Sequence, residues 1–130
     1  DGGTAPAAGV PFQKVSSSAE LDAALARATA AGTPVLFDFY AEWCVECKRM
    51  EGTTFADAGV RAALDRFVLL KIDVTDQTDE QEALQQRFGI IGPPATLFFS
   101  CPDEENRPLR LIGYEEAGPF AERVRRAADC

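Results

Sequence analysis

The stretch Trp43-Cys44-Val45-Glu46-Cys47-Lys48 decides the fold of this chain, and the rest can be placed around it. It follows the apolar run 35–40, Val-Leu-Phe-Asp-Phe-Tyr, in which Asp38 is the one charged residue. A run that is apolar on both faces is typical of a central parallel strand. The sequence therefore predicts a buried strand that delivers two cysteines to the start of a helix.

The spacing of the two cysteines suits reversible disulfide exchange. On a helix, residues i and i+3 share a face with Cβ atoms about 5–6 Å apart, so a disulfide forms with little backbone movement. Cys44 would lie at the helix N-terminus, where unpaired N–H groups and the helix dipole favour a thiolate. Cys47 would be more shielded. We expect Cys44 to attack a partner disulfide and Cys47 to resolve the mixed disulfide.

Other uses of a Cys-x-x-Cys pair fit the sequence less well. A zinc site needs a second pair of ligands, and neither Cys101 nor Cys130 has a near neighbour of that kind. A purely structural disulfide across one helical turn would close almost no loop. The chain has no histidine, which excludes His-containing metal sites and Ser-His-Asp or Cys-His hydrolases. The sequence predicts no metal and no cofactor besides the Cys44–Cys47 pair.

Length and charge narrow the class of protein further. With 130 residues, 46% of them hydrophobic, the chain is expected to form one domain at 11–130. The small, flexible residues 1–10 read as a linker, so we expect a monomeric domain excised from a larger protein. The net charge of −8 argues against nucleic acid as a partner. No apolar run approaches the length of a membrane span.

Strands and helices alternate along the predicted domain. A capping pattern at Ser17 and Glu20 opens a helix that stops at Gly32. The helix after the cysteines is expected to loosen at residues 52–54. The sequence predicts strands at 11–15, 35–40, 66–74, 95–99 and 109–114, and further helices at 57–65, 79–88 and 115–129. Such an order predicts an α/β fold with a mixed sheet and helices on both faces.

Two segments carry a resemblance to a known family. Residues 37–48 read Phe-Asp-Phe-Tyr-Ala-Glu-Trp-Cys-Val-Glu-Cys-Lys, and residues 92–99 read Gly-Pro-Pro-Ala-Thr-Leu-Phe-Phe. With Glu51 and Thr54-Phe55, they resemble thioredoxin-fold proteins, and most of all the C-terminal periplasmic domains of the DsbD family of transmembrane thiol:disulfide interchange proteins. A cytoplasmic thioredoxin carries Gly-Pro between its cysteines, which this chain lacks. The resemblance covers about residues 12–128.

This resemblance implies both a fold and a function. The fold is a thioredoxin fold, a central mixed β-sheet flanked by helices with an N-terminal strand–helix extension. The function is that of a protein-disulfide reductase in the periplasm, tethered to the inner membrane. It takes electrons from the family's transmembrane domain and passes them to its N-terminal periplasmic domain. Two alternatives are a free-standing thioredoxin-like reductase for cytochrome c maturation and a redox-inert binding module.

Carboxylates surround the cysteine pair in the sequence. Asp38 lies within an apolar strand, so its pKa should be raised unless it is salt-bridged or at an edge. The resemblance implies that Asp38 is a proton acceptor beneath Cys47. Glu51 is i+4 from Cys47 and shares its helical face, although a solvated glutamate fits that position too. With Glu46, these charges predict a Cys44 thiol less acidic than that of a strong oxidant, and a reducing couple.

Pro94 matches the cis-proline that faces the cysteine pair in thioredoxin folds, the alternative being two trans prolines in an ordinary turn. Pro93 departs from the family pattern, because a proline there has no N–H for a partner chain. Trp43 and Tyr40 flank the cysteines and are expected at the partner-binding surface, Trp43 on the exposed rim, although either could be core.

The two remaining cysteines are expected to meet. In this topology the strand at 95–99 runs away from the active-site end. The strand at 109–114 runs back toward it, and the last helix runs away from it again. A 14-residue helix spans about 21 Å, close to the length of a six-residue strand. Cys101 and Cys130 should therefore form a structural disulfide at the end opposite Cys44, rather than remain free thiols. Such a bond would indicate an oxidising compartment.

Overall fold

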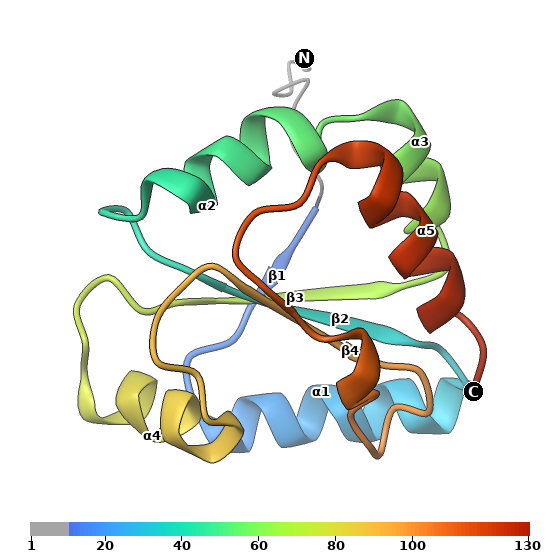
Figure 1. The fold of residues 1–130 in the computed structure, drawn as a ribbon. Coiled ribbons are helices and arrows are strands. Elements are labelled where there is room, and N and C mark those ends of the chain that lie inside the picture. The colour runs from blue at the N-terminus through green and yellow to red at the C-terminus, as the bar shows by residue number, and fades with distance from the viewer. Residues whose placement is uncertain (1–10) are drawn as a thin grey trace, which may run out of the picture.

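A five-stranded mixed sheet forms the centre of the molecule (Figure 1). The computed structural model describes residues 11–130, so the linker predicted at 1–10 lies outside the described residues. The strands are β1 (Gln13–Lys14), β2 (Val35–Tyr40), β3 (Val68–Asp73), β4 (Ala95–Phe99) and β5 (Leu111–Ile112). The helices are α1 (Ser18–Ala31), α2 (Val45–Arg49), the π-helix η1 (Met50–Thr54), α3 (Ala58–Ala63), α4 (Asp79–Phe88), the 3-10 helix η2 (Arg107–Leu109) and α5 (Ala117–Ala127).

The strand order is β1-β3-β2-β4-β5. β1, β3 and β2 run parallel, while β4 and β5 are antiparallel to their neighbours. Asp38, in the middle of β2, lies opposite Lys71 on one side and Thr96 on the other. The predicted α/β architecture with a mixed sheet is confirmed.

Helices cover both faces of this sheet, so β2 is buried along its whole length. α1 and α4 lie on one face, and α2, η1, α3 and α5 lie on the other (Figure 1). The alternation of side chains along β2 divides the core accordingly. Phe37 and Phe39 belong to the core cluster that includes Leu84 of α4, whereas Leu36 belongs to the cluster that includes Met50 of η1.

Local signals set the helix ends. Ser17 caps α1, and its side chain accepts the N–H of Glu20 at 3.2 Å. The Glu20 carboxylate accepts the N–H of Ser16 rather than that of Ser17, so the capping box is displaced by one residue. Gly32 and Gly89 end α1 and α4 with positive φ angles of 68° and 67°, a conformation that glycine adopts without steric cost.

Several predicted elements differ in the structure. The strand predicted at 11–15 shortens to β1, and the elements predicted at 57–65, 66–74 and 115–129 lose one or two residues at each end. The expectation that the chain loosens at residues 52–54 was wrong, because α2 continues directly into η1. Thr53 Oγ1 donates to the Arg49 carbonyl at 2.7 Å and holds the widened turn closed around Gly52. The strand predicted at 109–114 shortens to β5, since η2 takes up its start and Gly113, at φ 99°, ends it.

A disulfide joins Cys101 and Cys130, with their Cα atoms 4.9 Å apart. It links the segment after β4 to the segment after α5, at the end of the sheet where the topology predicts them to meet. The C-terminus and the start of α2 lie at opposite ends of the sheet (Figure 1). No helix within residues 11–130 is both long and apolar enough to cross a membrane.

Candidate redox-active site

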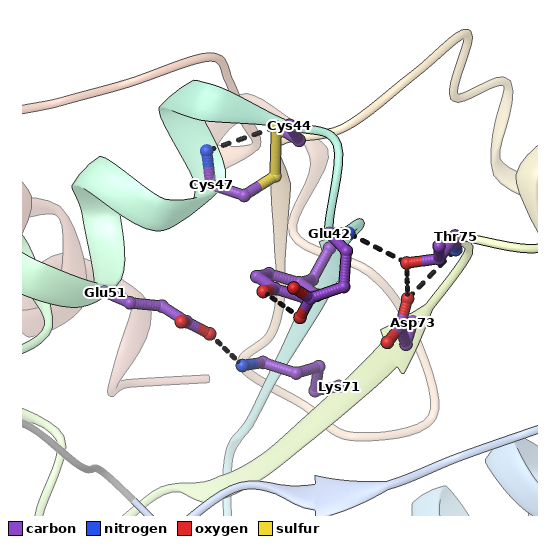
Figure 2. Close-up of a disulfide and its surroundings, with 8 residues drawn as sticks. Glu42, Cys44, Cys47, Glu51, Lys71, Asp73 and Thr75 are labelled. Atoms are coloured by element: carbon purple, nitrogen blue, oxygen red, sulfur yellow. Dashed lines mark hydrogen bonds and ion pairs between the residues drawn. A yellow bond between two sulfur atoms is a disulfide. The ribbon is translucent and has the colours of Figure 1, made fainter. Parts of the chain in front are cut away.

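Cys44 and Cys47 form a disulfide at the N-terminus of α2, with their Cα atoms 5.3 Å apart. Cys44 is the N-cap residue, and its sulfur accepts the N–H of Cys47 at 3.1 Å (Figure 2). The two cysteines are only 6% and 3% exposed. A sulfur in this position accepts from an otherwise unpaired helix N–H, an arrangement that also favours a thiolate once the bond is reduced.

The loop that carries Cys44 is fixed by the segment after β3. Thr75 Oγ1 accepts the N–H of Glu42 at 2.8 Å and donates to the carboxylate of Asp73. The Trp43 indole N–H donates to the Thr75 carbonyl at 3.1 Å. Thr75 was not predicted from the sequence. Its position directly after a central parallel strand was the available signal, because β2 and β3 end at the same edge of the sheet.

Tyr40 does not lie on the partner-binding surface, where the sequence placed it. Its side chain is buried, and its hydroxyl donates to Glu42 at 2.6 Å. Burial and this hydrogen bond raise the pKa of Tyr40 above its ordinary value. The same hydrogen bond, helped by Lys48 at 3.1 Å, lowers the pKa of Glu42. Tyr40 lies in the last position of a strand covered on both faces, and this coverage buries it.

Asp38 is buried, with 5% of its surface exposed. Burial raises its pKa from 3.8 to about 8; the positive charge of Lys71 opposes this shift, and the negative charge of Glu51 adds to it. Glu51 reaches from η1 to an ion pair with Lys71 on β3 (Figure 2). Asp38, Glu51 and Lys71 thus interact electrostatically as one group of charges. Lys71 was missed, although a lysine within an apolar strand was a visible signal.

Glu46, the third carboxylate near the cysteines in the sequence, lies on the outer side of α2. It pairs with Arg49 at 3.5 Å, and both side chains are about half exposed. Water and the neighbouring guanidinium screen its charge, so its influence on the cysteines is weaker than the sequence spacing alone suggests.

The peptide bond between Pro93 and Pro94 is cis. Ala95 pairs with Phe39 in the antiparallel register of β4 and β2, so the residues before Ala95 lie beside those that follow Tyr40. The turn therefore reaches the edge of the sheet that also carries the Cys44–Cys47 disulfide. Both prolines are half-buried there.

Exposed apolar side chains gather at this edge. Trp43 is 57% exposed, as predicted for the rim, and Val45 and Ile91 are exposed as well. Ile112, which pairs with Ala95, is the fourth. Within residues 11–130, these four are the exposed large hydrophobic residues, and we call them the apolar rim. An apolar surface around a disulfide suits contact with another protein rather than with a small polar ligand.

The described residues bring together an exchangeable disulfide, a buried acid that can hold a proton near neutral pH, and a surface for a protein partner. Cys101 and Cys130 lie apart from this site.

Sequence comparisons agree with this geometry. Residues 17–100 match the family model described as Thioredoxin-like. The chain is 51% identical, over 93% of its length, to the thiol:disulfide interchange protein DsbD of Ralstonia nicotianae. It is 45% identical, over 90% of its length, to DsbD 1 of Pseudomonas aeruginosa. The chain spans about a fifth of the length of these relatives, 20% of each.

Solved structures give the same result. The C-terminal domain of DsbD from Neisseria meningitidis, in its oxidised form, matches with a TM-score of 0.75 and 32% identity. This match covers 88% of the present chain and 99% of that domain. A thioredoxin from Thermus thermophilus matches with a TM-score of 0.73 and 28% identity, over 92% of this chain and 88% of that one. The chain therefore belongs to the thioredoxin-like family, where it groups with the C-terminal domains of DsbD as a thiol–disulfide oxidoreductase domain.

Proposed function

We propose that this domain relays electrons: it receives them from a transmembrane domain and passes them to a periplasmic partner domain through Cys44 and Cys47. The observation that carries the proposal is the Cys44–Cys47 disulfide at a helix N-terminus, beside an apolar rim. The likeness to DsbD relatives, of which the chain spans a fifth, supports the choice of donor and acceptor.

The reaction is two successive thiol–disulfide exchanges. In the reduced domain, the Cys44 thiolate attacks the partner's disulfide, and one partner sulfur leaves as a thiolate that takes up a proton. Cys47 then loses its proton and attacks the Cys44 sulfur, which releases the second partner sulfur. The second partner sulfur also leaves as a thiolate and takes up a proton. Two electrons thus pass to the partner, and the two protons that its thiolates take up balance those that Cys44 and Cys47 lose. The two cysteine sulfurs carry both electrons, so the reaction as proposed uses no further cofactor.

Asp38 is the proposed acceptor of the Cys47 proton. Asp38 shares a face of β2 with Leu36, whose core cluster includes Met50 of η1. η1 continues directly from α2, which carries Cys47. A carboxyl group with a pKa of about 8 can both take and return a proton near neutral pH. Glu51 and Lys71 set the charge around it.

Pro93 and Pro94 are proposed to shape the docking of the partner. A proline beside the disulfide has no N–H to compete for the sulfurs. Pro93 retains its carbonyl as an acceptor but cannot donate, so a partner strand that aligns here forms one backbone hydrogen bond fewer. The apolar rim, with Trp43 in place of the buried Tyr40, supplies the remaining contact.

The proposed location is the periplasm, with the domain tethered to the inner membrane through the rest of the protein. The Cys101–Cys130 disulfide supports an oxidising compartment, because such bonds are rare in the cytosol. In that compartment a reducing domain needs a supply of electrons, which fits a membrane-borne donor.

A trapping experiment tests the proposal. Replacing Cys47 with Ser removes the resolving thiol, so a natural partner stays bound to Cys44 as a mixed disulfide. Mass spectrometry of the trapped species should identify an N-terminal periplasmic DsbD domain. A cytochrome c maturation factor in its place would favour a free-standing reductase, and the absence of any trapped protein would favour a redox-inert binding module. Cys44→Ser/Cys47→Ser is the control.

A further inference from the structure

Thr96 on β4 carries a buried hydroxyl group that makes no hydrogen bond to the described residues. The residue is 1% exposed, and within residues 11–130 its Oγ1 is the buried side-chain nitrogen or oxygen that has no hydrogen-bond partner. Leaving a buried hydroxyl unpaired is unfavourable, and such groups usually find a partner in a bound water or in another state of the protein. The position of Thr96 points to the partner.

Thr96 lies directly opposite Asp38 in the antiparallel register of β4 and β2. Directly opposite residues share a face of the sheet, with Cβ atoms about 4.5–5.5 Å apart. The neighbouring pair on that face is Leu36 and Phe98, which belong to one core cluster with Met50 of η1. Asp38 and Thr96 are therefore buried together beneath η1, within reach of a side-chain rotation or of one bridging water.

The other polar groups around Asp38 already have partners. Lys71 of β3 pairs with Glu51 of η1, and the Tyr40 hydroxyl donates to Glu42. These groups set the charge that Asp38 experiences, whereas the Thr96 hydroxyl remains as an uncommitted donor. A hydroxyl can accept from a protonated acid and donate to a carboxylate, and its bond to the carboxylate is the stronger.

We propose that Thr96 is a positioning residue for Asp38: its hydroxyl hydrogen-bonds the Asp38 carboxyl, directly or through one buried water, and favours the carboxylate that receives the Cys47 proton. This role deepens the proposed function and rests on it for the identity of that proton. The bond is strengthened when the carboxylate forms, so it lowers the cost of holding a charge at a buried position.

Thr96→Val tests the role, because valine has nearly the shape of threonine and lacks the hydroxyl. Carbon-13 NMR of the Asp38 carboxyl in the oxidised protein should show its titration midpoint about one pH unit higher in Thr96→Val. Thr96→Ser keeps a hydroxyl and should titrate close to the parent. An unchanged midpoint in Thr96→Val would overturn the role. If Thr96→Val does not fold, Thr96→Ala provides the same comparison.

A kinetic measurement distinguishes a hydrogen bond from Thr96 to Asp38 from a role of Thr96 in core packing alone. In single-turnover reduction of a model disulfide, the pH profile of the Cys47 step should shift to higher pH in Thr96→Val by the same amount as the titration. The shift should disappear in an Asp38→Asn background. A slower step with an unshifted profile would indicate packing alone and would contradict the role.

Failure of the proposed function can be recognised separately. If the Cys44–Cys47 bond of the parent protein does not equilibrate with a glutathione buffer, the redox function fails. The carboxyl titration is measured without turnover, so it still decides whether Thr96 bonds Asp38.

Discussion

Asp38 is a single residue whose ionisation links the active site to the stability of the fold. Its pKa is about 8 in the folded protein and near 3.8 in an unfolded chain. Between these values the folded state retains a proton that the unfolded state has lost. The free energy of unfolding therefore falls as the pH rises through this window.

Asparagine at position 38 has a similar shape and cannot ionise, so it removes the loss of stability that the buried Asp38 carboxyl causes at high pH. We expect Asp38→Asn to be more stable than the parent at pH 8, by up to a few kcal/mol, and the difference to shrink toward pH 4. Urea denaturation at a series of pH values measures it. Asp103→Asn, at an exposed position, is the matched control, and a pH-independent gain for Asp38→Asn would contradict the linkage.

The reactivity of Cys44 should report the charges held near it. Removing one negative charge favours the thiolate, so Asp38→Asn and Glu51→Gln should each lower the midpoint pH of Cys44 alkylation, by some tenths of a unit to about one unit. Glu46→Gln should have a smaller effect, because Glu46 is exposed and paired with Arg49. The alkylation rate of the reduced protein against pH is the measurement. A parent midpoint well below that of free cysteine would refute the prediction of a weakly acidic thiol.

For single residues, the sequence predicts a role that depends on one segment better than a contact between two segments. Asp38 stands out as a charge in an apolar run, and Glu51 follows from helical spacing. The contacts of Lys71, Thr75 and Thr96 depend on which strands are neighbours and in what register, and periodicity does not reveal register. Tyr40 was misplaced for a related reason, since its burial comes from coverage by elements far away in the sequence.

The loop between β2 and α2 is held in place by hydrogen bonds to the segment that follows β3. Thr75 holds it through the N–H of Glu42, and Asp73 holds Thr75 in place. We expect Thr75→Val to destabilise the protein by about 1 kcal/mol and to speed hydrogen exchange at the Glu42 amide. Thr75→Ser should restore both. Normal protection of that amide in Thr75→Val would show that the hydrogen bond from the Trp43 indole N–H to the Thr75 carbonyl holds the loop by itself.

The lengths of the helices and strands depend on the residues at their ends. The helix at 79–88 and the strand at 95–99 were predicted with the bounds that the structure shows, since caps and turn residues border them. β5 is shorter than expected because Pro108 favours the 3-10 turn before it. The π-helix η1 depends on side-chain contacts such as that of Thr54 with the Glu115 carbonyl, which no local pattern contains.

Across the whole molecule, the four residues of the apolar rim come from three separate segments, with Trp43 and Val45 on either side of Cys44, and Ile91 and Ile112 each from another part of the chain. We expect Ile91→Ser to raise the KM for a protein-disulfide partner several-fold, because a fully exposed isoleucine gains burial only on docking. Equilibration of the same variant with glutathione should be unchanged, because a small thiol does not need the rim. A change in both would indicate damage to the disulfide itself.

The two disulfides lie at opposite ends of the sheet and should differ in what they contribute to stability. Cys101 and Cys130 are 29 residues apart in sequence, and in the chain-entropy model a loop of that size contributes about 3–4 kcal/mol. Cys101→Ser/Cys130→Ser should lose about that amount in urea denaturation. Cys44→Ser/Cys47→Ser should lose less, because its cysteines are three residues apart. Alkylation of reduced Cys44 should be unaffected in the first variant, and a changed rate would mean that the far disulfide also shapes the active-site end.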